Sequence, residues 1–216
     1  MKPYYLNMEE MLQEEQKVYA EELKGTDWRY IKEASDLFLI HAYSHLFESH
    51  SEEVFADKNY TKRYSQFNLN LAVGIELLLK ALLLKKGVEI NLPLKNGTSG
   101  EIDPEKTISL RAAIDRLNKI FPHLSKTTLE ELKNTLKLIN LRRNNIAHCS
   151  KRSSDHYAYE YRFSYVILYI YEEFFHGENA ELTDMLRKSI DRSRVTQGSD
   201  FKPLKIKPKS LRSKGL

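Results

Sequence analysis

The sequence predicts an all-α fold built on one hydrophobic core. Apolar residues recur at alternating spacings of three and four over long segments, which is the period of an amphipathic helix. No segment rich in alternating β-branched residues is long enough to build a sheet. A chain of 216 residues with 41% hydrophobic content can form one full core. We therefore expect one helical bundle with terminal extensions.

The first half of the chain holds three predicted helices, at about residues 8–23, 27–50 and 61–86. Gly25 follows the first helix and Gly87 follows the third, and glycine is a common helix stop. Pro93, Asn96, Gly97 and Gly100 are all turn formers, so residues 88–104 are predicted to form a loop or a short hairpin.

Helix is predicted to resume at Asp103, where aspartate can cap and the following proline suits a first turn, and to end at Pro122. Thr127 and Thr128 precede Glu130 and Glu131 in the register of a capping box, so they predict the next start. The apolar positions of that helix are Leu129, Leu132, Leu136 and Ile139.

Two more helices are predicted near the C-terminus, at about residues 155–175 and 180–190. The first has an apolar stripe and is followed by Gly177. The stripe consists of Phe163, Val166, Ile167, Ile170 and Phe174.

Three regions follow from these patterns: an acidic N-terminal helix (1–26), a helical bundle (27–193) and a basic, irregular tail (194–216). Residues 1–60 hold thirteen acids against six bases, whereas residues 187–216 hold ten bases against two acids. The tail cannot bury a core of its own, so we expect it to be disordered or to dock. Its candidate partners are RNA and the acidic N-terminal helix, in cis or between protomers.

Cellular location is predicted from two further features. A single cysteine, Cys149, excludes an internal disulfide framework and fits a reducing compartment. The N-terminus lacks the long apolar stretch of a secretory signal, and the apolar run 71–84 is shorter than the roughly 20 residues of a membrane span. We expect a cytoplasmic protein in which that run is a buried core helix.

The most informative segment is Arg143-Asn144-Asn145-Ile146-Ala147-His148. The apolar positions of the helix that precedes it step next to position 143, where an arginine stands in place of an apolar residue. An arginine in a packed seam is costly unless its guanidinium finds anions or a polar cavity. The segment is therefore a candidate functional site.

Arginine and histidine together suit metal-independent cleavage of RNA. Histidine, with an ordinary pKa of about 6.5, can exchange a proton at neutral pH, and arginine stabilises charge on a phosphate. The ribose 2′-hydroxyl is then the nucleophile. No cluster of carboxylates accompanies the segment to serve a two-metal mechanism, and we expect neither a metal nor a cofactor.

On one ideal helix, positions 143 and 148 lie about 140° apart and do not share a face. They can converge if the helix frays near Ala147. They can also converge if a two-fold axis brings the same segment of a second protomer alongside.

The pattern Arg-Asn-x-x-x-His, with the helix Glu76-Leu77-Leu78-Leu79-Lys80-Ala81-Leu82 before it, resembles the HEPN superfamily over about residues 30–176. The resemblance implies a helical bundle that dimerises through the motif helices. In many members it also implies a metal-independent endoribonuclease of toxin-antitoxin or antiviral defence systems. Arg143 and His148 would be the catalytic pair and Asn144 would shape the site.

The implied partners are RNA, a second copy of the chain, and an antitoxin or defence-system protein. In some members an antitoxin modifies a tyrosine two residues after the histidine, where this chain has Ser150. Further RNA contacts are expected from neighbouring polar and basic residues, namely Arg142, Asn145, Lys151 and Arg152. Glu76 and Lys80, spaced i, i+4, are expected to form a structural ion pair or a polar contact to the motif helix.

Two alternatives remain open from the residues alone. In one, Arg143 pairs with a core acid such as Glu76, and His148 caps helix carbonyls. In the other, the same dimer is catalytically silent and binds RNA as a regulatory subunit.

Other reactive residues receive structural interpretations. His41 and His45 share a face near Glu48 and His50, but no zinc-protease pattern is present. Cys149 is expected to be a small buried hydrophobe. Six tyrosines could stack on bases, yet they are more typical of bundle packing with hydroxyls at the rim. They are Tyr157, Tyr159, Tyr161, Tyr165, Tyr169 and Tyr171.

Overall fold

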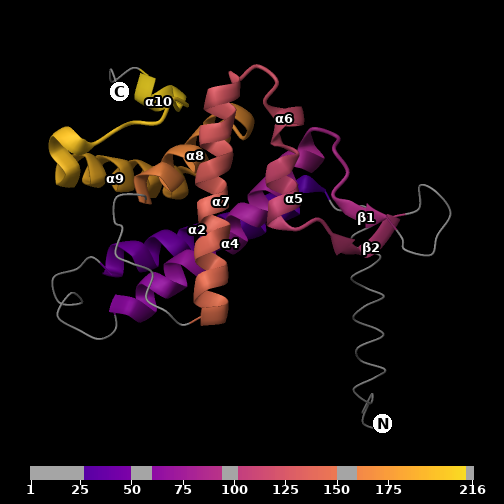
Figure 1. The fold of residues 1–216 in the computed structure, drawn as a ribbon, viewed down its shortest axis with the longest axis horizontal. Coiled ribbons are helices and arrows are strands. Elements are labelled where there is room, and N and C mark those ends of the chain that lie inside the picture. Colours follow the sequence, from indigo (N-terminus) through magenta and orange to yellow (C-terminus); the bar gives the residue numbers. More distant parts are fainter. Residues whose placement is uncertain (1–26, 50–59, 94–101, 150–159, 213–216) are drawn as a thin grey trace, which may run out of the picture.

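The computed structural model describes residues 27–49, 60–93, 102–149 and 160–212, and in this part of the chain the fold is all-α with one small hairpin (Figure 1). The predicted acidic helix of residues 8–23 lies outside the described residues. The long helices are α2 (Trp28–Ser49), α4 (Tyr60–Lys85), α7 (Lys126–Cys149), α8 (Glu160–Phe174) and α9 (Ala180–Gln197). The short elements are β1 (Asn91–Pro93), β2 (Ile102–Thr107), α5 (Leu110–Asp115), α6 (Leu117–Ile120), the 3-10 turn η2 (Gly198–Asp200) and α10 (Lys209–Arg212).

Helices α2 and α4 form an antiparallel pair at the centre of the core, with the bounds that the sequence predicted to within one residue. Gly74 permits their close approach, because a Cβ at this position would lie 2.7 Å from Leu39 Cγ. The Ser35 hydroxyl also donates a hydrogen bond to the Gly74 carbonyl at 2.8 Å. The backbones of the two helices are therefore in near contact at this point.

Helix α8 is the most deeply buried element of the bundle. Phe163, Val166, Ile167 and Ile170 are all fully buried, as the predicted stripe requires. Its tyrosines also pack inside rather than at an RNA-facing surface: Tyr161, Tyr165, Tyr169 and Tyr171 are all buried. Helix α7 runs the full height of the view in Figure 1 and packs on α4, α5 and α8.

The connection between α4 and α7 corrects one prediction. Asp103 does not begin a helix; it lies in β2, which pairs antiparallel with β1 as the alternative short hairpin. The helix starts at Leu110, because Ser109 caps it by accepting a hydrogen bond from the Ala112 N–H. An Asp-Pro pair fits the edge of a two-stranded ribbon as well as a first helical turn, so the sequence signal was ambiguous.

The start of α7 also differs from its prediction. Ser125, not Thr127, accepts the hydrogen bond from the backbone N–H three residues later, at 3.2 Å. Its hydroxyl also contacts the Thr128 hydroxyl at 2.8 Å. The helix therefore begins at Lys126, one residue before the predicted start.

The basic tail docks on the bundle in cis. Helix α9 continues to Gln197, beyond the predicted end near residue 190 and across the predicted boundary at 193. The following segment then returns over the bundle and buries Leu204, Ile206 and Leu211. Its backbone is held by carboxylates: the Lys205 N–H donates to Glu131, and the Ser210 N–H donates to Glu172. The tail is irregular, as predicted, apart from η2 and α10.

Within the described residues, one segment, 62–85 of α4, is long and apolar enough to cross a membrane by length and composition. Most of this segment is buried inside the bundle, where Phe67, Leu71, Ile75 and Leu82 are inaccessible. It packs as the core helix that the sequence predicted.

Candidate active site on helix α7

The seam of α7 leads into two adjacent arginines. Leu132, Leu136 and Ile139 are buried, and the next inward positions on this helix are Arg142 and Arg143. Both guanidinium groups reach acids or hydroxyls supplied by other helices. The predicted polar interruption of the core is therefore real, and it involves two residues rather than one.

Arg143 lies at the end of a chain of polar contacts that starts in the hairpin. Its Nη1 donates to Glu76 Oε2 at 3.2 Å, and Lys80 Nζ contacts the other oxygen of the same carboxylate at 2.8 Å. Lys80 Nζ also donates to the Thr107 hydroxyl of β2 at 2.9 Å. The Glu76–Lys80 ion pair and its contact to the motif helix are thereby confirmed.

This arrangement keeps Arg143 accessible. Its side chain is 40% exposed, compared with 22% for Glu76 and 11% for Lys80. Arginine has five N–H donors, and the Glu76 contact uses one nitrogen, Nη1. The guanidinium is thus anchored from the core side while part of it faces solvent.

Arg142, expected to contact RNA, is instead buried with 7% exposure. Its Nη1 donates to the Tyr64 hydroxyl at 3.0 Å, and its guanidinium carbon lies 5.3 Å from the centre of the Phe163 ring. The buried carboxylate of Glu160 is close enough to interact electrostatically with both Tyr64 and Arg142. Arg142 therefore joins α7 to α4 and α8 and is not placed to bind RNA.

The Glu160 carboxyl is titratable near neutrality. Burial raises its pKa to about 7, although the hydrogen bond with Tyr64 and the charges of Arg142 and Arg192 act in the opposite direction. Burial also raises the pKa of Tyr64. The sequence gave no sign of Glu160 or Tyr64, because their role depends on which helices meet.

The outer face of α7 carries a second stripe, opposite the buried seam. Asn134, Leu138, Leu141 and Asn145 follow one another at spacings of four, three and four, and position 148 continues the series. Leu141 is 55% exposed. A groove on this face is lined by Leu138 and Leu141 with basic and amide side chains, namely Arg111, Asn134, Lys137, Asn140 and Asn144.

The structure resolves one question about the motif and leaves its last residues undescribed. Helix α7 is unbroken through Cys149, so fraying near Ala147 does not bring positions 143 and 148 together. Arg143 turns inward to Glu76, whereas Asn144 lines the outer groove and Asn145 is exposed. The side chains of His148 and Cys149, and residues Lys151 and Arg152, lie outside the described part.

The histidines of α2 do not assemble a metal site among the residues that the structure describes. His41 is exposed, and His45 Nδ1 lies 3.7 Å from Glu48 Oε2. Over the described ranges, no group of three or more His, Cys, Asp or Glu side chains is placed to hold a metal ion. His50 falls outside those ranges.

No protein-family model, no curated protein and no solved structure matches this chain, so the site is interpreted from its own geometry.

The buried carboxyl of Glu160 predicts a pH-dependent stability. A carboxyl whose pKa is raised by folding binds its proton more tightly in the native state. Its contribution is most favourable below the ordinary carboxyl pKa of about 4.3 and is lost as the pH rises through about 7. Glu160→Gln should therefore reduce the loss of unfolding free energy between about pH 5 and pH 8, measured by urea denaturation.

Exposed Glu33 provides the matched control, because Glu33→Gln removes a carboxylate from the same bundle without touching the buried cluster. Its pH profile should follow that of the wild type. Identical pH profiles for Glu160→Gln and wild type would show that Glu160 titrates normally.

Proposed function

We propose that this chain is a metal-independent endoribonuclease of the HEPN type, acting in the cytoplasm as a homodimer in a toxin-antitoxin or antiviral defence system. Arg143 would hold the scissile phosphate, His148 would transfer the proton and Asn144 would orient the pair. The observation that carries the proposal is the half-exposed guanidinium of Arg143, anchored by Glu76 on the seam of an otherwise apolar helix.

The anchoring of Arg143 supports a role in binding phosphate. An arginine needed only for packing would be buried like its neighbour Arg142. Arg143 instead keeps 40% of its side chain in solvent, and Glu76 restricts the positions its guanidinium can occupy. A cation that is fixed in place before the substrate arrives stabilises developing charge with little reorganisation.

The outer stripe of α7 supports dimerisation. Leu138 and Leu141 form an apolar centre flanked by the amides of Asn134 and Asn145, a pattern suited to packing against a second helix. An isologous contact places the same stripe of both protomers face to face. Position 148 lies in this stripe, so two motif segments would converge on one cleft.

The chemistry at such a cleft is transesterification. The His148 imidazole takes the proton of the ribose 2′-hydroxyl, and the 2′-oxygen bonds to the adjacent phosphorus. Arg143 stabilises the charge that develops on the phosphoryl oxygens. The bond from phosphorus to the 5′-oxygen breaks, and the leaving oxygen takes a proton from an imidazolium. The products carry a 2′,3′-cyclic phosphate and a 5′-hydroxyl.

One observation favours the alternative of a silent RNA-binding subunit. The Glu76 carboxylate already neutralises Arg143 and competes with a substrate phosphate for it. In that case the cleft binds RNA without cleaving it, and the activity assay below separates the two functions.

Replacing the motif histidine should abolish cleavage while leaving the fold intact. With purified wild-type protein, a labelled RNA pool incubated with EDTA should yield fragments ending in 2′,3′-cyclic phosphate. His148→Ala should cleave at least about 100-fold more slowly, the usual contribution of a general acid-base group. His41→Ala, which removes an exposed histidine of α2, should retain the wild-type rate.

Intact RNA with wild-type protein, together with measurable RNA binding that Arg143→Ala weakens, would support the silent subunit instead. Equal cleavage by wild type and His148→Ala would refute the assigned site.

A charge in the outer stripe should separate the protomers. Leu141→Glu places a carboxylate at the centre of the proposed interface, so sedimentation should show a monomer where the wild type is a dimer. The cleavage rate should fall in parallel, because the cleft requires both copies. Leu37→Glu, an equally exposed position on α2, is the control and should remain dimeric. A wild-type monomer that cleaves RNA would contradict this part of the proposal.

A further inference from the structure

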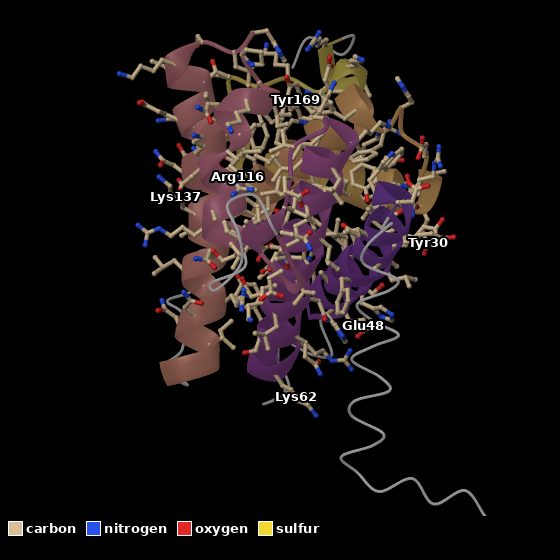
Figure 2. All side chains as sticks on the ribbon, turned by 90° about the vertical axis from the view of Figure 1, so that its right-hand side faces the viewer. Tyr30, Glu48, Lys62, Arg116, Lys137 and Tyr169 are labelled. Atoms are coloured by element: carbon tan, nitrogen blue, oxygen red, sulfur yellow. The ribbon has the colours of Figure 1, made fainter. Side chains whose placement is uncertain are left out.

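Helices α2 and α4 share an exposed apolar face on the side of the bundle away from α7. Leu37 is 62% exposed and Tyr30 is 70% exposed, and Phe38 lies beside them on α2. Val73 and Leu77 contribute from the outward side of α4. In Figure 2, Tyr30 and Lys137 lie on opposite sides of the molecule, so this face is distinct from the outer stripe of α7.

The face is continuous across the two helices. Leu39 of α2 contacts Gly74 of α4, which sets the antiparallel register of the pair. In that register Phe38 lies opposite positions 73–74, and one turn earlier Ala34 lies opposite positions 77–78. Apolar side chains from both helices thus adjoin along about three turns, which is a seat of the width that one further helix covers.

The chain immediately before α2 matches this face in pattern. Residues 8–23 place Met8, Met11, Leu12, Val18, Tyr19 and Leu23 on one side of a helix. Glu10, Glu14, Lys17 and Glu21 fall on the opposite side, where they would remain in water. A stripe of this kind is stable only when it is buried against another apolar surface.

Length and connection also match. Sixteen residues of helix span about 24 Å, and residues 28–41 of α2, which carry the exposed side chains, span about 20 Å. Residues 24–27, including Gly25, would form the turn, and connections of this length join antiparallel helices. The short connection gives the segment a high effective concentration at the face.

We propose that residues 8–23 form a helix that packs antiparallel on the α2–α4 face and completes the bundle. Leu12 then lies at the level of Leu37, and Leu23 lies near Tyr30. This inference does not rest on the ribonuclease proposal, because it concerns a different surface and different residues.

Chemical cross-linking of the full chain tests the seat directly. Leu12→Cys and Leu37→Cys are combined with Cys149→Ser, which removes the native cysteine, and the protein is treated with a short bismaleimide. The matched control replaces Leu12→Cys by Lys17→Cys, a position at a similar level on the opposite side of the predicted helix. Neither exposed Leu37 nor the terminal segment is needed for the described core, so the variants should fold.

An intramolecular cross-link should form in the Leu12 pair about tenfold faster than in the Lys17 pair, because only the first pair faces across the contact. Equal rates in the two pairs would mean that the segment has no fixed seat. Cross-links between chains in place of the intramolecular product would assign the face to a second copy. Either result overturns the proposal.

A second measurement does not depend on cysteines. In the wild type, the backbone amides of residues 8–23 should exchange with deuterium slowly, and Leu37→Glu should make them exchange at the rate of an unfolded chain. Leu141→Glu, on the outer stripe of α7, should leave their exchange slow. Fast exchange in the wild type would contradict a docked helix.

Discussion

Two adjacent arginines on the inward side of α7 impose the constraint on which the site depends. A buried guanidinium requires a partner, because an uncompensated charge in the core costs several kcal/mol. The bundle meets this requirement from two directions: Tyr64 and Glu160 lie beside Arg142, and Glu76 binds Arg143. The positions of α4 and α8 around α7 are thereby tied to the motif.

The two arginines have different roles as a result. Arg142 is enclosed and links three helices, whereas Arg143 is held by one carboxylate and remains half-exposed. Glu76 connects Arg143 to Lys80, and Lys80 reaches the hairpin through Thr107. The orientation of a surface guanidinium thus depends on the packing of the core helix α4 and on the position of β2. A change in either element is expected to alter the site without touching the motif.

Much of the fold could be predicted from the sequence, because long amphipathic helices have a strong period. The bounds of α2 and α4, the stripe of α8 and the Glu76–Arg143 pairing all followed from spacing and residue type. Short-range signals were less reliable: Asp103-Pro104 suits a strand edge as well as a helix start, and Ser125 competed with Thr127 as the cap. The roles of Arg142 and Glu160 could not be predicted, because they arise only where three helices meet. The docking of the tail depends in the same way on carboxylates far along the chain.

The direct test of this account is a double-mutant cycle on the pair that joins α4 to α7. Glu76→Ala, Arg143→Ala and the double variant are compared in their free energies of unfolding by urea. Because the pair is partly exposed, we expect a coupling energy of about 0.5–1 kcal/mol in favour of the pair. Additive effects, with a coupling energy of about zero, would show that Glu76 does not hold Arg143.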